Sequence, residues 1–332
     1  MVEYKGVMVL IEFTGNQLAL ITTELLGCAR KLAGDLGEEL YAVIIGNGIN
    51  SLAQEAFAFG ADKVCIIDDP LLEDYQTDTY VAVLEKVIKK IMPQILILGQ
   101  NSTGRDLAPR LAFRLDTAAL MDCLELTIDP DTKLLLHTKP VYGGNALAIF
   151  TSVSYPQIAT VRAKTMLPLE RDTSRQGEVI TIEADLDSSV IKAKLLEKVP
   201  EALEGIRLED AEVIVSGGRG IGSAEGFEQL EEMAQMLKGA LGATRPPCDN
   251  GWVPANLQIG LTGKIVAPNL YIAIALSGSS QHMSGCSGAK TIVAINKDPE
   301  ANIFREARFG VVGDWKKVLP TFAGKIRELL AK

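Results

Sequence analysis

Short apolar runs alternate with helical patterns through the first third of the chain, and this alternation limits the possible folds more than any other feature. Strands that alternate with helices at such a spacing form a parallel sheet with crossover helices. We therefore expect an N-terminal α/β domain of nucleotide-binding type. The strand-like runs are Val7–Ile11, Tyr41–Ile45, Lys63–Ile67 and Ile95–Leu98, and the helical patterns are Gln17–Leu36, Ser51–Phe59, Thr79–Lys90 and Gly104–Leu115.

The middle of the chain follows a different pattern. Between Ala118 and Arg162, short β runs are separated by turn residues such as Gly143-Gly144-Asn145, which predicts an antiparallel extension of the first domain. The next stretch, Arg171–Leu208, is polar and has a proline and a glycine near its end. We place the domain boundary there, and expect a first domain at 1–204 and a second at 205–332.

The second domain begins the α/β pattern again and predicts a second parallel sheet. A strand at Glu212–Val215 is followed by the glycine-rich loop Ser216–Ser223 and a helix at Glu225–Leu241. A nucleotide in such a sheet lies outside the carboxyl ends of the strands. Later strands are expected at Leu270–Leu276, Thr291–Ile295 and Phe309–Val312, with a terminal helix at Trp315–Leu330.

Composition excludes several classes of function. The 332 residues carry a net charge of −9 without a dense lysine and arginine cluster, which argues against nucleic acid and anionic membranes as partners. Apolar runs fall far short of the ~20 residues of a membrane helix, and no signal pattern opens the chain, so we expect a cytosolic protein. Two histidines and five scattered cysteines argue against a metal site or a disulfide framework. The cysteines are Cys28, Cys65, Cys123, Cys248 and Cys286.

Several strands of the second domain end in residues suited to a nucleotide. The loop at 216–223 offers backbone N–H groups for a pyrophosphate, and Arg219 can bind a phosphate. Small and polar residues, Ser277–His282, follow the next strand, and Asn296 and Asp314 follow two others. Each feature alone is equally compatible with a turn, a helix cap or a structural histidine, and the loop lacks the GxGxxG spacing. Together they favour a nucleotide-type ligand.

At this point the sequence resembles a known family. The stretch Val213–Pro320 is similar almost throughout to the FAD domain of electron transfer flavoprotein alpha subunits, and the first domain is similar as well, so the resemblance covers essentially the whole chain. The blocks that carry it are Ser216–Gly220, Gly242–Arg245, Asp249–Trp252, Thr262–Lys264, Leu270–Ala273, Ser277–His282 and Ile292–Asp298, with Gly104–Arg110, Pro140–Ala146 and Pro156–Arg162 in the first domain.

The resemblance implies a set of FAD-binding residues. It places Arg245 against the isoalloxazine ring, the Thr262 hydroxyl near flavin N5, and His282 at the pyrimidine O2 edge. Asn296 and Asp314 are implied to hold the adenosine half. The whole implied set is Arg219, Thr244, Arg245, Ile259, Gly260, Leu261, Thr262, Ser277, Gly278, Ser279, Ser280, Gln281, His282, Asn296, Asp314 and Trp315.

Two positions depart from the family's pattern. Thr244 stands where serine is usual, which keeps the hydroxyl and adds a methyl group. Leu261 replaces the usual glutamine, so one polar contact beside the ring is lost. The second change puts the redox tuning of the flavin in question rather than its binding.

The function implied is that of an electron carrier. The resemblance predicts an FAD-carrying alpha subunit that pairs with a beta subunit and exchanges electrons with partners such as acyl-CoA dehydrogenases, in some systems with electron bifurcation. In the family the beta subunit binds AMP, or a second FAD. No general base stands out in the sequence, so we expect no catalytic residue of its own, and donors from His282 and Arg245 are expected to favour the one-electron-reduced flavin. The alternatives are a stand-alone flavin- or NAD-dependent dehydrogenase and a nucleotide-binding assembly subunit without a redox role.

Overall fold

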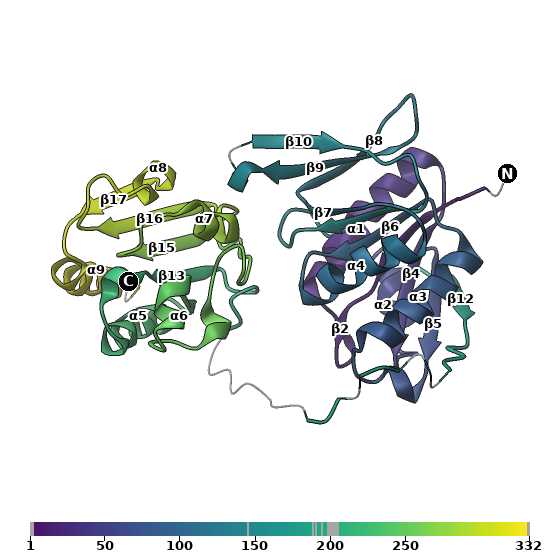
Figure 1. Cartoon of the computed structure of the whole chain (residues 1–332), viewed down its shortest axis with the longest axis horizontal. Helices are drawn as coiled ribbons and strands as arrows, with labels where there is room; N and C mark the ends of the chain where they lie inside the picture. The colour runs from purple at the N-terminus through teal and green to yellow at the C-terminus, as the bar shows by residue number, and fades with distance from the viewer. Residues whose placement is uncertain are drawn as a thin grey trace. The chain divides into compact units, whose positions relative to one another are not determined.

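The computed structural model describes residues 3–144, 146–187, 189, 191–193, 195–197 and 206–330. The chain divides into two compact units (Figure 1). The first unit comprises Met1–Val141 with Leu147–Val199, and the second comprises Tyr142–Ala146 with Pro200–Lys332. The boundary predicted between residues 204 and 205 falls outside the described residues, so it stays a prediction.

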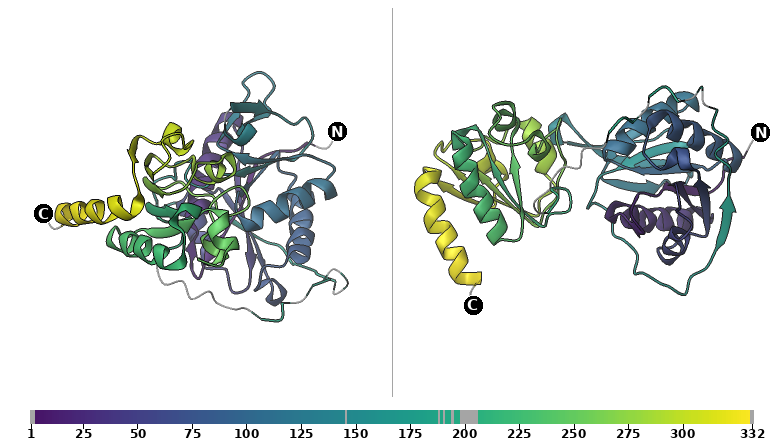
Figure 2. Two further views of the ribbon diagram at one scale, coloured as in Figure 1. Left: turned by 60° about the vertical axis from the view of Figure 1, so that its left-hand side comes forward. Right: turned by 90° about the horizontal axis from the view of Figure 1, so that it is seen from below.

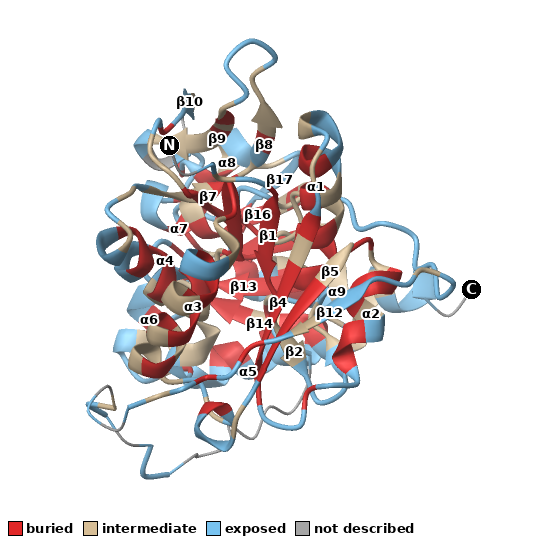
Figure 3. Cartoon of the chain, turned by 90° about the vertical axis from the view of Figure 1, so that its right-hand side faces the viewer, coloured by how far each residue is buried: buried red, intermediate tan, exposed pale blue. Residues whose placement is uncertain are grey.

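The first unit is built on a seven-stranded sheet whose strand order is β12-β5-β4-β1-β6-β11-β7. The pairings are parallel, as the alternation of strands and helices predicts. The central strands consist of buried aliphatic residues, and Figure 3 shows β1 and β4 as mostly buried. The strands are β1 (Val7–Leu10), β4 (Leu40–Gly46), β5 (Lys63–Asp68), β6 (Ile95–Gly99), β7 (Ala119–Cys123), β11 (Gln157–Val161) and β12 (Glu178–Thr181).

Helices cover both faces of this sheet, and each face has its own apolar core. Helices α1 (Leu20–Leu36) and α2 (Leu52–Ala58) pack on one face. Helices α3 (Thr77–Ile91) and α4 (Ser102–Arg114) pack on the other, where the 3-10 turn η1 (Pro70–Leu72) also contributes. The parallel α/β sheet with crossover helices expected from the sequence is therefore confirmed, and it is doubly wound.

The antiparallel extension is smaller than the β pattern from Ala118 to Arg162 predicts. A separate three-stranded sheet has the order β10-β9-β8, and β8 pairs antiparallel with β9. Strands β7 and β11, from the same stretch, join the parallel sheet instead. The sheet's members are β8 (Glu125–Ile128), β9 (Leu135–Val141) and β10 (Ala146–Phe150), with the 3-10 turn η2 (Tyr142–Gly144) between the last two.

Two further elements of the first unit differ from the sequence prediction. The helix expected from Gln17 begins only at Leu20, because Gln17–Leu18 forms β3 and pairs with β2 (Phe13–Thr14) in a small hairpin. Strand β12 lies in the stretch we expect to be a polar connection, and it pairs in parallel with β5 at the sheet edge. Its side chains are mostly exposed, so it carries no strong apolar pattern that would reveal it.

The second unit contains a five-stranded parallel sheet with the order β14-β13-β15-β16-β17. Numbered along this unit, the order is 2-1-3-4-5, which is the flavodoxin-like variant of the doubly wound fold. The strands are β13 (Val213–Gly217), β14 (Ala240–Ala243), β15 (Leu270–Ile274), β16 (Thr291–Asn296) and β17 (Phe309–Val312).

Helices again cover both faces of the sheet in the second unit. Helices α7 (Ser280–Cys286) and α8 (Ile303–Glu306) contribute to the core on one face. Helices α5 (Ala224–Met236) and α9 (Trp315–Leu330) contribute to the core on the other (Figure 2). Short turns and a one-turn helix complete the unit: η4 (Arg219–Ile221), α6 (Arg245–Asp249) and η5 (Ala255–Leu257).

The helix predicted at Glu225–Leu241 is too long, and the structure corrects it. Helix α5 ends at Met236, and the chain turns through Lys238, whose φ is +51°. A Cβ atom on Gly239 would lie 2.4 Å from the carbonyl oxygen of Val213. Only glycine permits this close approach to β13. The helix therefore ends before Gly239, and the chain continues beside β13 as the edge strand β14.

No helix in the described part of the chain is long and apolar enough to span a membrane. The cytosolic location expected from the sequence stays a prediction.

The close approach at Gly239 yields a stability prediction. Replacing Gly239 with alanine forces β13 and β14 apart, and we expect it to destabilise the second unit by about 1–3 kcal/mol, as overpacking does. Both tryptophans, Trp252 and Trp315, lie in this unit, so denaturant unfolding followed by tryptophan fluorescence reports on it. Gly324→Ala in α9 is the control, because no atom lies within 4 Å of its added Cβ and alanine favours a helix. Equal denaturant midpoints of unfolding for Gly239→Ala and Gly324→Ala would contradict the prediction.

Candidate functional site

The topological switch point of the second unit lies between β13 and β15. In a sheet of this order, ligands bind outside the carboxyl ends of the strands at the switch point. The loop after β13 and the loop after β15 meet there: Gly218 N–H donates to the Ile274 carbonyl at 3.0 Å, and Gly220 N–H donates to the Ala275 carbonyl at 3.2 Å. The two segments predicted from the sequence, Ser216–Ser223 and Ser277–His282, are therefore brought together.

Glycines make this close packing of the two loops possible. A Cβ on Gly218 would lie 2.5 Å from the Ala275 carbonyl oxygen. Gly278 has a φ of +71°, and a Cβ there would lie 2.5 Å from the backbone nitrogen of Ile303. Exposed polar side chains surround these glycines: Arg219, Ser277, Ser279, Ser280 and Gln281.

A third loop, Ile259–Thr262, follows η5 and reaches the same region beside β14. Ile259 N–H donates to the Ala243 carbonyl at 2.9 Å, and Leu261 N–H donates to the Gln281 carbonyl at 2.8 Å. The Thr262 hydroxyl accepts a 2.9 Å hydrogen bond from Gln258 Nε2. The Leu261 side chain is 56% exposed.

His282 is buried, and both of its ring nitrogens are already bonded within the protein. Nδ1 lies 3.0 Å from the Ile259 carbonyl oxygen, and Nε2 lies 2.9 Å from the Tyr271 hydroxyl. Burial lowers the pKa of His282 to about 4, so the ring is neutral at pH 7. His282 therefore supplies no positive charge at this pH, and its contact with a flavin stays a prediction.

Three other implied residues also use their polar groups within the chain. Asn296 Nδ2 donates to the Leu276 carbonyl at 2.8 Å, and Asp314 Oδ1 accepts from Lys316 N–H at 3.0 Å. Trp315 is buried, and its Nε1 donates to the Gly220 carbonyl at 3.2 Å. These bonds fix the strand ends and the glycine loop, and whether the same residues also hold an adenosine stays a prediction.

Thr244 and Arg245 follow β14 at the same edge of the sheet. Thr244 N–H donates to the Gly217 carbonyl at 3.0 Å, which ties β14 to the start of the glycine loop. The Arg245 side chain is 65% exposed, and its Nε lies 3.2 Å from Asp249 Oδ2, one helical turn later. Because an exposed pair of this kind contributes little free energy, the guanidinium is free to exchange this partner for an anion.

Sequence reasoning missed Tyr271, the partner of His282. The sequence does contain a signal for it, since Tyr271 stands inside the apolar strand Leu270–Ile274. A phenol in a buried strand requires a hydrogen-bond partner. His282, eleven residues later in the chain, is the polar residue that supplies it.

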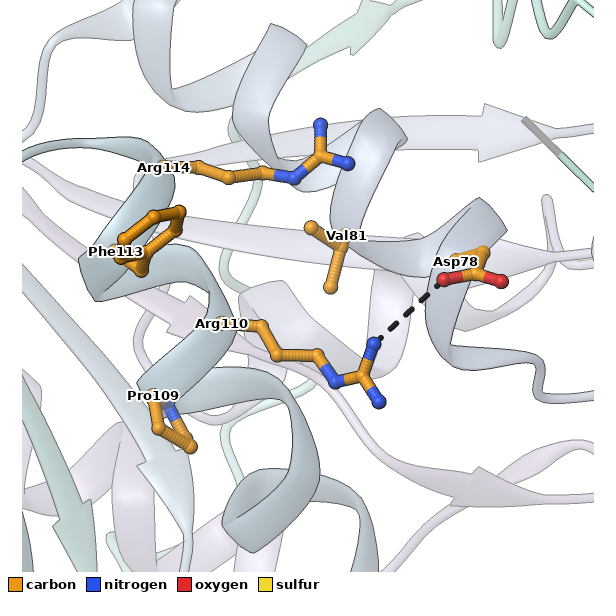
Figure 4. A pocket seen from close by; sticks show the side chains of 6 residues that line it. All are labelled: Asp78, Val81, Pro109, Arg110, Phe113 and Arg114. Carbon is orange, nitrogen blue, oxygen red and sulfur yellow. Dashed lines mark ion pairs between the residues drawn. The ribbon is translucent and has the colours of Figure 1, made fainter. Parts of the chain in front are cut away.

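The first unit has a surface pocket of its own (Figure 4). It has a volume of about 330 Å³ and lies between α3 and α4. Its two arginines are already paired with carboxylates, Arg110 with Asp78 and Arg114 with Glu85. These pairs neutralise the charge that would attract an anion, so we assign the pocket no ligand.

Comparison with known proteins identifies the family. The description "Electron transfer flavoprotein domain" matches residues 7–187, and "Electron transfer flavoprotein FAD-binding domain" matches residues 207–287. The proteins named electron transfer flavoprotein subunit alpha in Thermoanaerobacterium thermosaccharolyticum and Megasphaera elsdenii are each 43% identical to this chain. These matches cover 98% of the chain and 99% and 97% of the two relatives. The chain belongs to the electron transfer flavoprotein alpha-subunit family.

Membership in the electron transfer flavoprotein family confirms the function expected from the sequence, that of a flavin-carrying electron-transfer subunit with a second subunit as its partner. The stand-alone dehydrogenase is not favoured. A further relative, named lactate dehydrogenase (NAD(+),ferredoxin) subunit LctC, from Acetobacterium woodii, is 36% identical over 96% of this chain and 76% of its own length.

The residues at the switch point fit a flavin nucleotide. Gly218 and Gly278 stand where a Cβ would clash with backbone, so the loops form a narrow, backbone-lined edge. Hydroxyl, amide and guanidinium groups border that edge, and these groups bind phosphate and ring oxygens.

The buried, neutral His282 makes the stability of the second unit depend on pH. Between pH 6.5 and about 4 the unfolded chain binds a proton at this position and the folded chain does not, so stability falls as the pH falls through this window. Lowering the pH from 7 to 5 should therefore reduce the free energy of unfolding by about 2 kcal/mol, because His282 is protonated only in the unfolded chain.

Urea unfolding followed by tryptophan fluorescence at both pH values measures this loss. The free energy of unfolding falls between pH 7 and pH 5. In His282→Gln this fall should be smaller by about 2 kcal/mol than in the unsubstituted chain. His137 has a pKa lowered to about 4 by burial in the first unit and is present in both proteins, so it does not contribute to the difference. An identical pH dependence in both proteins would contradict a neutral His282.

Proposed function

We propose that the chain binds one FAD noncovalently at the carboxyl edge of β13 and β15 and passes single electrons as the alpha subunit of a heterodimer. The observation that carries this proposal is the convergence of three loops, 217–222, 259–262 and 277–282, at the switch point of a 2-1-3-4-5 sheet. The match to an FAD-binding family domain over residues 207–287 covers all three loops.

Each loop has its own binding role in this proposal. Arg219 and the backbone N–H groups of the glycine loop bind the pyrophosphate, together with the Ser277–Ser280 segment. The Thr262 hydroxyl and Arg245 face the ring system, and Asn296 and Asp314 face the adenosine. Bound FAD supplies the redox chemistry, and the protein supplies binding, orientation and electrostatics.

Arg245 contributes the positive charge in this proposal. Its guanidinium carries the charge, whereas the neutral His282 does not contribute any. A cation beside a ring that gains an electron stabilises the reduced state more than the oxidised state.

Replacing Arg245 with alanine should lower the first reduction potential of the bound flavin. A hydrogen bond to a charged group is worth roughly 1.5–3 kcal/mol, which corresponds to roughly 60–130 mV for one electron. Spectroelectrochemical titration of the purified heterodimer measures this change. Arg327→Ala, in the last turn of α9, removes the same charge from the second unit and is the control. The assignment of Arg245 fails if flavin remains bound and its potential is the same in both variants.

We also propose that the first domain packs on the beta subunit through β10. This strand is at the edge of its sheet, and its side chains Leu147 and Ile149 are 64% and 66% exposed. No aspartate, glutamate, lysine or arginine occurs between Lys139 and Arg162. Because proteins usually protect exposed edge strands with charged residues, an uncharged apolar edge indicates a surface that a partner covers.

A double substitution tests this interface. Leu147→Glu with Ile149→Glu should weaken binding of the beta subunit at least about tenfold, because each charge must lose water on association. Val179→Glu, on the exposed edge strand β12, is the matched control and should leave affinity unchanged. Affinities come from sedimentation of the co-expressed subunits. Equal affinity of both variants would exclude β10 from the interface.

The redox partner proposed for the heterodimer is a dehydrogenase. The resemblance implies a partner of the acyl-CoA dehydrogenase type, and the relative in Acetobacterium woodii carries the name of a lactate dehydrogenase subunit. Both names denote enzymes that remove electrons from small organic acids or their thioesters. Reduction of the bound flavin by each class of dehydrogenase, followed by absorbance, distinguishes the two.

A further inference from the structure

Residues 258–264 form a loop that carries Thr262, and backbone hydrogen bonds close this Thr262 loop at its base. Lys264 N–H donates to the Gln258 carbonyl at 2.8 Å, and Gly260 N–H donates to the Lys264 carbonyl at 3.2 Å. The Thr262 hydroxyl accepts from Gln258 Nε2 at 2.9 Å, so its position depends on the same base. Lys264 therefore uses both of its backbone polar groups to hold the two ends of the loop together.

The side chain of Lys264 is paired with a residue that is distant in the sequence. Its Nζ lies 2.6 Å from Oε1 of Glu209, and each of the two side chains is 32% exposed. The other carboxylate oxygen of Glu209, Oε2, is buried and has no hydrogen-bond partner within the described part of the chain. Removing one partner from such a half-buried pair is costly, because the remaining charge is left without compensation.

Glu209 belongs to a turn, residues 207–211, that leads into β13. Two other residues of this turn, Leu208 and Ala211, are buried in the same apolar core as Ile259 of the Thr262 loop. Burial of these two side chains fixes the turn on the second unit. The ion pair therefore connects a fixed segment at the start of β13 to the base of the Thr262 loop.

We propose that Glu209 and Lys264 are positioning residues for electron transfer, which hold the Thr262 loop in place by anchoring its base to the turn at 207–211. The effect on the flavin rests on the function proposed above, since Thr262 faces the ring system there. The effect on the loop concerns the protein alone.

Single substitutions break the ion pair from either side. Glu209→Gln removes the negative charge, and Lys264→Met removes the positive charge. Lys264→Arg keeps the cation and is one rescue variant. The double variant Glu209→Lys with Lys264→Glu is the other, because it exchanges the charges and leaves the combined length of the two side chains unchanged.

Lys325→Met is the matched control. Lys325 also lies 2.6 Å from a carboxylate oxygen, that of Glu328 in α9, but these side chains are 69% and 65% exposed. An exposed pair of this kind contributes little free energy, so its loss should leave the Thr262 loop unaffected.

The first readout is amide hydrogen exchange in the full chain, purified with its partner subunit and freed of flavin. The N–H groups of Gly260, Gly263 and Lys264 are bonded within the loop and report on it. Their exchange should rise about tenfold in Glu209→Gln and further in Lys264→Met, which leaves the carboxylate without its donor. Both rescue variants and the control should stay within about twofold of the unsubstituted protein.

Two results of this measurement would overturn the proposal. The first is unchanged exchange of the loop in both single variants, including a rise confined to Asp210, whose N–H donates to the Arg207 carbonyl within the turn. The pair would then anchor the turn alone. The second is a rise in the single variants that neither rescue variant reverses, since the charges would then not be responsible.

The second readout is the first reduction potential of the flavin-loaded heterodimer. Glu209→Gln and Lys264→Met change the net charge in opposite directions. Displacement of Thr262 predicts a shift of the potential in the same direction in both variants, and its return in the rescue variants. Shifts in opposite directions would mean that the charges act on the flavin across a loop that stays in place, and would overturn the positioning role.

The exchange measurement decides the role of the ion pair without any flavin. Failure of FAD to bind the unsubstituted heterodimer would instead contradict the proposed function, and the exchange of the Thr262 loop would still show whether Glu209 and Lys264 hold it.

Discussion

The parallel pairing of β13 with β15 is the interaction on which the site of the second unit depends. The register that matches Val213 with Leu270 and Gly217 with Ile274 brings both strands to an end at the same level. Two loops that are far apart in the sequence therefore leave the sheet side by side, and backbone hydrogen bonds from Gly218 and Gly220 join them. Side chains contribute specificity at this edge, but the backbone of the sheet determines where the edge is.

The polar residues around this edge divide into two groups with different physical roles. Buried groups, such as those of His282, Asn296 and Trp315, are bonded within the chain and fix the shape of the loops. Exposed groups, such as those of Arg219 and Arg245, have little internal constraint and can rearrange around a ligand. A site built in this way keeps its shape through buried hydrogen bonds, and its exposed side chains adapt.

Much of this arrangement could be predicted from the sequence, because it depends on local pattern. The buried strands are short aliphatic runs, and the glycine loop and Ser277–His282 stand directly after two of them. Strand β14 could not be found in this way, since its existence depends on Gly239 passing close to Val213, a contact distant in sequence. The contact between Tyr271 and His282 is likewise a tertiary contact, which residue types alone do not give.

The uncharged edge at β10 has a consequence for how the chain is made in the cell. An exposed apolar strand at the edge of a sheet is a template on which another copy of the same strand can pair. Copies synthesised in excess over the partner subunit would display this template to one another, and self-association would compete with correct assembly. The two subunits should therefore be produced together and in equal amounts, because an excess of this chain would self-associate through β10.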